Sequence, residues 1–306
     1  MRAAVTGSSG FVAGHLVPYL RSLGDEVVTL DRSGEPPVDV TDTHRVRDVL
    51  RRARPDAMYH LAGLSHVGES WDAPETVFRV NAEGTLSVLR ACADAGVERV
   101  LVAGSADEYG VVDVDDLPIT EEAPIRPITP YGASKAAADV LALQAFLADG
   151  LGTLRVRAFN HTGPGQISTM LVPGLAARIA TAEREGQHVI KVGNLDVVRD
   201  LTDVRDVVRA YRLLVEHGTP GEAYNVCSGH GVTVREIATG LMALSYSRFT
   251  LVVDSELLRT VDVPRLVGSP ARLYAATGWE PEIDLRATMR DVLSEARTRD
   301  ARNPTT

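Results

Sequence analysis

Residues 2–13 read RAAVTGSSGFVA: an apolar run, a turn with glycines at 7 and 10, and the start of a helical pattern. We expect a buried strand over Arg2–Thr6 and a helix over Gly10–Leu23. Glycines at these positions would let the backbone approach a pyrophosphate, to which the helix N-terminus presents free N–H groups. The turn therefore predicts a dinucleotide site, with GxxGxxA spacing in place of the commoner GxGxxG.

Beyond this unit, short apolar runs alternate with helical patterns as far as residue 158. We expect strands over 26–30, 57–61, 99–103 and 153–158, and helices over 43–53, 74–95 and 131–149. Strands that alternate with helices form parallel sheets, because each connection is a crossover. The pattern therefore predicts an α/β fold with a Rossmann-type, doubly wound parallel sheet that has helices on both faces.

The second half of the chain is less regular. We expect helices over 172–184, 204–217, 233–244 and 285–297, and a short strand over 223–227. A stretch rich in Gly and Pro at 161–166 marks a change of lobe. We therefore expect a dinucleotide-binding domain over residues 1–160, with 194–228 returning to it, and a smaller C-terminal α/β substrate lobe from 161–193 and 229–306.

Composition narrows the classes of function. The 306 residues carry a net charge of −9, which argues against binding to nucleic acid or to a membrane surface. No apolar run reaches the roughly 18 residues of a membrane span, and the N-terminus lacks an export signal, so we expect a cytoplasmic protein. Cys92 and Cys227 form no CxxC pair and the eight histidines form no HxH or HExxH pair, so we expect no metal site.

The segment Tyr131-Gly-Ala-Ser-Lys135 carries the sharpest chemical signal. Residues four apart share one face of a helix, which places the phenol beside the ammonium. A neighbouring positive charge favours phenolate, so we expect the pKa of Tyr131 to be lowered towards neutrality. Of 32 basic residues only Lys135 and Lys191 are lysines, which indicates that Lys135 does something arginine cannot. The alternative is an ordinary surface pair.

Other candidate site residues follow the expected strands, at the edge where doubly wound folds bind ligands. Asp31 would bind the adenosine ribose hydroxyls and disfavour a 2′-phosphate, whereas the adjacent Arg32 could pair with one, which leaves NAD(H) and NADP(H) open. Asp39 and Val40 would contact the adenine. Ser105 would polarise a substrate carbonyl beside the phenol. The alternative interpretations are a turn residue for Asp31, a loop carboxylate for Asp39 and a helix or turn cap for Ser105.

Taken together, these residues resemble the extended short-chain dehydrogenase/reductase family, the epimerase/dehydratase branch that acts on nucleotide-sugars. The resemblance covers nearly the whole chain, in order: TGSSGFVA at 6–13, HLAG at 60–63, VNAEGT at 80–85, Ser105, YGASK at 131–135, FNHTGP at 159–164, VRDLTD at 198–203, YNV at 224–226 and TGW at 277–279. Within the family, AFNHTGPGQ at 158–166, IKVGN at 190–194 and YNVCSG at 224–229 are most similar to GDP-4-keto-6-deoxymannose reductases.

The resemblance implies a role for each matching residue. Ser105, Tyr131 and Lys135 match a catalytic triad. The implied cofactor contacts are Gly7, Gly10, Phe11 and Val12 at the pyrophosphate, Asp31 at the ribose, Asp39 and Val40 at the adenine, and Leu61, Ala62 and Gly63 along the cofactor. Asn160 matches a substrate-facing asparagine, and Ser105 and Asp107 are further implied substrate contacts. Arg199 and Arg259 match arginines that bind the diphosphate, and Lys191, Val192 and Gly193 lie where the base is held. Alternatively, Arg199 is a cap or forms an ion pair with Asp200 or Asp203, and Arg259 is an ordinary surface arginine.

One departure bears on the reaction. Dehydratases of the family have an acid, commonly Glu, two residues after the triad hydroxyl, where this chain has Asp107, and some have an Asp where this chain has Ala106. The elimination machinery is therefore weakened, although close reductase relatives also carry an acid at this position. The resemblance thus implies NAD(P)H-dependent reduction of a nucleotide-linked 4-keto-6-deoxyhexose at C4.

Three alternatives stay open: a 4,6-dehydratase or epimerase with retained NAD, a dTDP-4-keto-6-deoxyhexose ketoreductase, and a non-catalytic dinucleotide sensor. The intact triad argues against the sensor. The family also implies a homodimer, in which helices over 81–95 and 131–149 pair with their copies.

Overall fold

The glycine-rich turn follows the carboxyl end of an inner strand of a six-stranded sheet in which every strand pair is parallel. The computed structural model describes residues 1–258 and 261–302. In order along the sheet, the strands are β2 (Glu26–Leu30), β1 (Arg2–Thr6), β3 (Ala57–His60), β4 (Arg99–Ala103), β5 (Gly152–Ala158) and β9 (Ala223–Val226). The chain winds outward from β1 in both directions. The doubly wound, Rossmann-type sheet is therefore confirmed.

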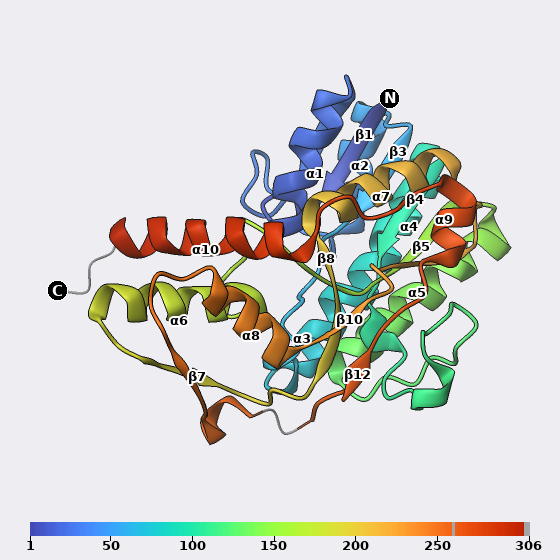
Figure 1. The fold of residues 1–306 in the computed structure, drawn as a ribbon. Helices are drawn as coiled ribbons and strands as arrows, with labels where there is room; N and C mark the ends of the chain where they lie inside the picture. Colours follow the sequence, from blue (N-terminus) through green and yellow to red (C-terminus); the bar gives the residue numbers. More distant parts are fainter. Residues whose placement is uncertain (259–260, 303–306) are drawn as a thin grey trace.

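Helices cover both faces of this sheet (Figure 1). On one face lie α1 (Phe11–Ser22) and α7 (Val204–His217), and on the other α2 (Thr43–Ala53), α4 (Gly84–Ala95) and α5 (Pro130–Asp149). Side chains of a strand alternate between faces, so Ala3 and Val5 pack in the first core and Ala4 in the second. The apolar strands are buried on both sides, as their near-continuous hydrophobic sequences predict.

The helix expected over 74–95 is interrupted. It consists of α3 (Pro74–Phe78), a π-helical turn at Arg79–Glu83 and then α4. A π turn inserts an extra residue per turn and is frequent at functional sites. Here it carries Asn81, whose contacts are described below.

Outside the six-stranded sheet, the structure contains more strands than the sequence led us to expect. The helices of this part are α6 (Leu171–Glu185), α8 (Val234–Ala243) and α10 (Leu285–Arg302), and α6 and α10 lie side by side (Figure 1). The strand β8 (Val198–Asp203) pairs with β6 (Asn160–Thr162), β10 (Gly231–Thr233) and β12 (Arg265–Leu266), while β7 (Val189–Val192) pairs with β11 (Thr250–Val253). These strands have two to six residues, too short for a clear periodicity, which is why we did not expect them.

The segment after β12 returns to the large sheet. Leu273, in α9 (Ala271–Thr277), and Trp279 are buried in the same core as α1 and α7. The Trp279 indole N–H donates to the Asp206 carbonyl oxygen at 3.0 Å. Among the described residues, no helix combines the length and apolar character needed to cross a bilayer.

Candidate active site

The glycine-rich turn lies directly against the end of β3. Gly7 has a φ of +65°, and a Cβ placed on it would lie 2.8 Å from the Ala62 Cα. Only glycine meets both conditions without strain. The Gly10 N–H donates to the Gly7 carbonyl oxygen at 2.9 Å, and no side chain in the described part of the chain caps α1 there. The first N–H groups of α1 are thus available to an anion, and the close-set backbone fits a dinucleotide pyrophosphate.

A chain of hydrogen bonds beneath the turn fixes its neighbour β3. The Thr85 hydroxyl donates to the Asn81 carbonyl oxygen at 2.6 Å, so it accepts from His60 Nε2–H, 3.0 Å away. His60 Nδ1 therefore accepts from the Thr6 hydroxyl at 2.8 Å. The oxygen of this hydroxyl in turn accepts from the backbone N–H groups of Leu61 and Ala62, each at 3.2 Å. Burial, with a smaller effect of Lys135, lowers the pKa of His60 from 6.5 to about 3. The imidazole is neutral.

Asp31 joins the end of β2 to the turn. One carboxylate oxygen accepts from the Ser33 backbone N–H at 3.0 Å and hydroxyl at 2.8 Å, and the other accepts from the Ser9 N–H at 3.0 Å. Burial raises the pKa of Asp31, but the hydrogen bonds from Ser33 and Ser9 outweigh it and bring it to about 2. The carboxylate lies where a ribose contact was expected, and it also holds the turn in place.

The expected adenine residues have different surroundings. Asp39 is exposed and accepts from the Thr41 N–H and hydroxyl, which lower the pKa of Asp39, and the exposed Arg32 contributes to that shift. Val40 is buried, and its Cγ2 would lie 2.9 Å from a Cβ on Gly84. The Val40 side chain therefore packs on the beginning of α4.

Asn81 in the π turn connects β3 to α5. Its side-chain oxygen accepts from the Leu64 N–H at 2.8 Å, and its amide donates to the Leu64 carbonyl and to the Ser134 hydroxyl. A Cβ on Gly63 would lie 2.9 Å from this oxygen and 3.3 Å from the Lys135 Nζ. Asn81 matched the family pattern, but its sequence did not indicate this bridging role, since its partners lie 17 and 53 residues away.

Ser105 begins a 3-10 turn at Ala106–Glu108 immediately after β4. The Ser105 hydroxyl donates to an Asp107 carboxylate oxygen at 3.1 Å, and the Ser105 N–H donates to Glu108 at 2.8 Å. The two ends of this S-x-x-E segment form a capping box. We did not single out Glu108 from the sequence, although the capping-box pattern was a signal that could have found it.

Tyr131 and Lys135 lie on the first turns of α5, but their relation differs from our expectation. Burial and the nearby Asp107 carboxylate raise the pKa of Tyr131 above its ordinary value, against a lowering hydrogen bond with Ser105. The Lys135 Nζ donates to the Ala103 carbonyl oxygen at 2.7 Å. The expectation that Lys135 makes the phenol acidic was therefore wrong: desolvation of the buried phenol dominates.

Apart from Ser105 and Asp107, the described residues expected to bind substrate lie on the short strands β6, β7 and β8. Asn160 is exposed at the start of β6, and the next residue, His161, stacks on Phe11 with ring centroids 6.2 Å apart. The substrate side is thus in contact with the pyrophosphate turn. Lys191 in β7 is exposed and forms an ion pair with Asp254 at 2.9 Å.

Arg199 in β8 is a buried arginine. It forms an ion pair with Asp262 at 2.6 Å and donates to the carbonyl oxygens of Val198 and Val263 at 2.9 and 2.7 Å. The sequence did not indicate Asp262 as its partner. Arg259, the other expected diphosphate contact, lies outside the described residues.

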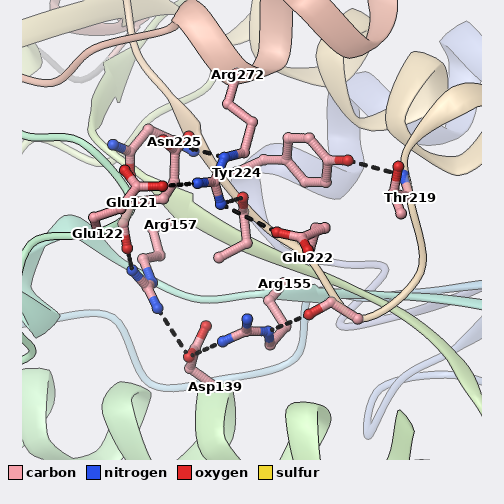
Figure 2. A network of polar contacts seen from close by, with 12 residues as sticks. Glu121, Glu122, Asp139, Arg155, Arg157, Thr219, Glu222, Tyr224, Asn225 and Arg272 are labelled. Atoms are coloured by element: carbon pink, nitrogen blue, oxygen red, sulfur yellow. Dashed lines mark hydrogen bonds and ion pairs between the residues drawn. The ribbon is translucent and has the colours of Figure 1, made fainter. Parts of the chain in front are cut away.

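A polar network joins β5 to α5 (Figure 2). Asp139 accepts from Arg155 at 2.7 Å and from Arg157 at 3.2 Å. Arg157 also donates to the Tyr109 hydroxyl, which in turn donates to Asn225 in β9 at 2.7 Å. The network joins β5, α5, β9 and the segment after Ser105. Its members lie up to 116 residues apart, so sequence spacing did not indicate it.

Comparison with known proteins identifies the family. The chain matches the model of the NAD dependent epimerase/dehydratase family over residues 3–227. It is 37% identical over 300 residues to a GDP-6-deoxy-D-mannose reductase of Pseudomonas aeruginosa, covering 97% of this chain and 98% of that protein. The structure of RMD from P. aeruginosa complexed with NADPH has a TM-score of 0.89 and 37% identity, covering 97% and 99% of the two chains.

The UDP-glucose 4-epimerase of Thermus thermophilus in complex with NAD is also similar, with a TM-score of 0.86, 29% identity and coverage of 97% and 99%. The chain belongs to the NAD-dependent epimerase/dehydratase family, the extended branch of the short-chain dehydrogenases/reductases. It is an NAD(P)-dependent enzyme, and the resemblance found in the sequence is confirmed. Among the residues that the structure describes, no cluster of potential metal ligands occurs.

Substitution of Gly7 by alanine should weaken cofactor binding. The added Cβ would clash with Ala62 and force a left-handed backbone conformation that costs about 1–2 kcal/mol for an L-residue. We expect the NADPH dissociation constant, measured by fluorescence titration, to rise about tenfold or more. Gly14→Ala in α1 is the control, since its Cβ meets no described atom within 4 Å. Equal affinities of the two variants would contradict this role of the turn.

Acid should destabilise the protein through His60. Its pKa is 6.5 unperturbed and about 3 when folded, so below pH 6.5 the unfolded state binds a proton that the folded state does not. This contribution is complete above pH 6.5 and is lost as pH falls towards 3, by about 1.4 kcal/mol per pH unit. We therefore expect the free energy of unfolding, measured in urea, to fall between pH 7 and pH 5 by about 2 kcal/mol less in His60→Asn than in the parent.

The matched control is His217→Asn, because the His217 side chain is 57% exposed. We expect this variant to follow the parent across the same pH range. An identical pH dependence for the parent and His60→Asn would show that His60 is not held neutral in the fold.

Proposed function

We propose that this enzyme is a ketoreductase that reduces the C4 keto group of a nucleotide-linked 4-keto-6-deoxyhexose, with GDP-4-keto-6-deoxymannose as the first candidate. The observation that carries the proposal is the juxtaposition of the buried Tyr131 phenol with the Ser105 hydroxyl, just after the carboxyl end of β4. A reduction needs such a proton donor. The 37% identity to a GDP-6-deoxy-D-mannose reductase over nearly the whole chain supports the choice of substrate.

In this reaction the bound nicotinamide supplies a hydride to C4 of the sugar. The Tyr131 O–H bond breaks and its proton passes to the carbonyl oxygen on C4, which stays bonded to the sugar, so that the ketone becomes an alcohol. The Ser105 hydroxyl hydrogen-bonds this oxygen and favours the developing negative charge. Lys135 extends from α5 and brings its positive charge to the end of β4, close to the reacting groups. Because burial raises the pKa of Tyr131, the phenol enters the reaction protonated.

The substrate contacts are part of the same proposal. Asn160 and Asp107 would contact the sugar, Arg199 and Arg259 the diphosphate, and Lys191 the base. Bidentate guanidinium groups suit phosphate oxygens. We propose that residues 1–160 and 194–228 form the cofactor-binding domain, to whose core Leu273 and Trp279 also belong, and that the rest of 161–193 and 229–306 forms the nucleotide-sugar-binding lobe, in a cytoplasmic enzyme.

A retained-NAD epimerase or dehydratase is the main alternative, because an epimerase in complex with NAD shares the fold. The two differ in their use of the cofactor. A ketoreductase consumes one reduced cofactor for each sugar, whereas an epimerase or dehydratase regenerates its NAD in every cycle.

The purified protein should oxidise NADPH or NADH only when a 4-keto-6-deoxyhexose nucleotide is present, and GDP-, dTDP- and UDP-linked forms identify the base. Tyr131→Phe should lower kcat about 10²- to 10⁴-fold, because it lacks the proton to donate, while NADPH still binds. Tyr246→Phe is the control, since Tyr246 is 90% exposed. Turnover of GDP-mannose without net cofactor consumption would refute the proposal, and full activity of Tyr131→Phe would favour a non-catalytic sensor.

We also propose that the enzyme is a homodimer that pairs through α5. Val140 and Leu147 are exposed on this helix, seven residues apart and therefore on one face. Phe78 in α3 and Trp71 are exposed on elements that contact α5. Exposed large apolar side chains that gather over neighbouring elements are typical of a protein interface.

Light scattering should give twice the monomer mass for the parent. Val140→Glu should shift the mass towards the monomer, because a charge would be buried without a partner in the interface. Leu23→Glu is the control, since Leu23 is exposed at the end of α1 on the other face of the sheet. A parent protein with monomer mass at all concentrations would contradict the dimer.

A further inference from the structure

The inner strand β5 directs two arginines towards α5. Its apolar residues lie in the core that contains α1 and α7, so the alternate residues Arg155 and Arg157 lie on the opposite face. Both guanidinium groups donate to the buried Asp139 of α5, which lies between them (Figure 2). Charges buried in this way add little net stability compared with well-packed apolar side chains. Their presence on an inner strand therefore calls for a reason other than stability.

Arg157 contacts both of the segments that carry the reacting groups. Its Nη2 donates to the Asp139 carboxylate at 3.2 Å, and its Nη1 donates to the Tyr109 hydroxyl at 3.1 Å. Asp139 follows Tyr131 by eight residues in the same helix, and Tyr109 follows Ser105 by four residues. One planar, rigid guanidinium group thus joins the helix of the phenol to the turn of the catalytic hydroxyl.

The Tyr109 end of this connection is itself firmly held. The Tyr109 side chain is fully buried, its hydroxyl donates to Asn225 Oδ1 at 2.7 Å, and the Arg157 guanidinium lies 5.2 Å from its ring centroid. Arg157 also donates to the Glu121 carbonyl oxygen at 3.0 Å, and its Nε lies 3.6 Å from Glu108 Oε2. Movement of Tyr109 would leave buried polar groups without partners, which is costly.

Nearer the site, the Ser105 turn and α5 meet with little clearance. A Cβ on Gly132, the residue after Tyr131, would lie 2.6 Å from the Asp107 carbonyl oxygen. The Ser105 hydroxyl is within hydrogen-bond reach of the Tyr131 phenol. A backbone contact at one point would still allow the turn to rotate against the helix. A second connection, through Arg157, removes that freedom.

We propose that Arg157 is a positioning residue that sets the orientation of the Ser105 hydroxyl relative to the Tyr131 phenol. The effect on the reaction rests on the proposed ketoreductase function, but the effect on geometry does not. Arg155 provides the contrast within the same strand. It shares Asp139 with Arg157, but its Nε donates to the Gly221 carbonyl oxygen at 3.1 Å, away from the Ser105 turn.

Kinetics of Arg157→Met and Arg155→Met test the effect on the reaction. Each variant replaces a guanidinium group with an apolar side chain and removes one of the two hydrogen bonds to Asp139, so both should lower the free energy of unfolding in urea. Only Arg157→Met should lower kcat, by about 10- to 100-fold, because a small misplacement of reacting groups is costly. The KM for NADPH should change little, since the glycine-rich turn follows β1. An equal loss of kcat in both variants would overturn the proposal.

A milder variant covers the case in which Arg157→Met does not fold. Tyr109→Phe removes only the hydroxyl that accepts from Arg157 and donates to Asn225. It should lower kcat in the same direction, again with little change in the KM for NADPH. Where Arg157→Met folds, adding Tyr109→Phe to it should lower kcat little further, because the connection is already broken. Full, independent losses of kcat from the two substitutions would contradict a shared connection.

A spectroscopic measurement tests the geometry without any substrate. The full-length protein has eight tyrosines, so labelling with 3-fluorotyrosine gives a small set of ¹⁹F signals, and Tyr131→Phe identifies the Tyr131 signal by its loss. Arg157→Met, or Tyr109→Phe in its place, should shift the Tyr131 signal, whereas Arg155→Met should leave it near its parent position. An unchanged Tyr131 signal in the folded variant would refute the proposal. A shifted signal in a protein that turns over no keto-sugar would instead refute the ketoreductase function and leave the role of Arg157 standing.

Discussion

The site depends on a single ammonium group that is held inside the protein. Lys135 extends from α5 to the end of β4, where its Nζ donates to the Ala103 carbonyl oxygen and lies close to Gly63. Burial of a charge is expensive unless hydrogen bonds and opposite charges offset it. In the structure the Ala103 carbonyl oxygen accepts from the ammonium at 2.7 Å, and the loop after β3 comes close to it through Gly63.

This constraint explains why the neighbouring backbone is so closely pinned. Asn81 ties the β3 loop to α5, and His60 ties the same loop to β1 through Thr6. The glycine-rich turn in turn rests on Ala62. The glycine-rich turn and α5, which carries Tyr131 and Lys135, are therefore connected through one loop.

The surroundings of the Tyr131 phenol favour its uncharged form. Tyr131 is buried beside a carboxylate, so its environment favours the protonated form. For a group that donates a proton during reduction, this is the useful state before the reaction begins. Burial thus keeps a proton on Tyr131, while the buried Lys135 ammonium is held by its hydrogen bond to the Ala103 carbonyl oxygen.

Local patterns were sufficient to predict the parallel sheet, the glycine turn and the residues that end its strands. Strand and helix periodicities and a glycine at a left-handed position depend on the nearest few residues, which sequence displays directly. The same reasoning missed the short strands of the second lobe, because two to six residues carry too little periodicity.

Alternating apolar runs and helical patterns over residues 2–158 predicted the fold class, residues 2–13 the dinucleotide-binding turn, and residues 131–135 the candidate catalytic tyrosine and lysine. Only the tertiary structure decided the proton affinity of Tyr131 and the partner of Arg199. Those properties depend on burial and on charges that lie far away along the chain, as Asp262 lies 63 residues from Arg199. Spacing in a sequence specifies which side chains share a helix face, but not which of them lose their water when the chain folds.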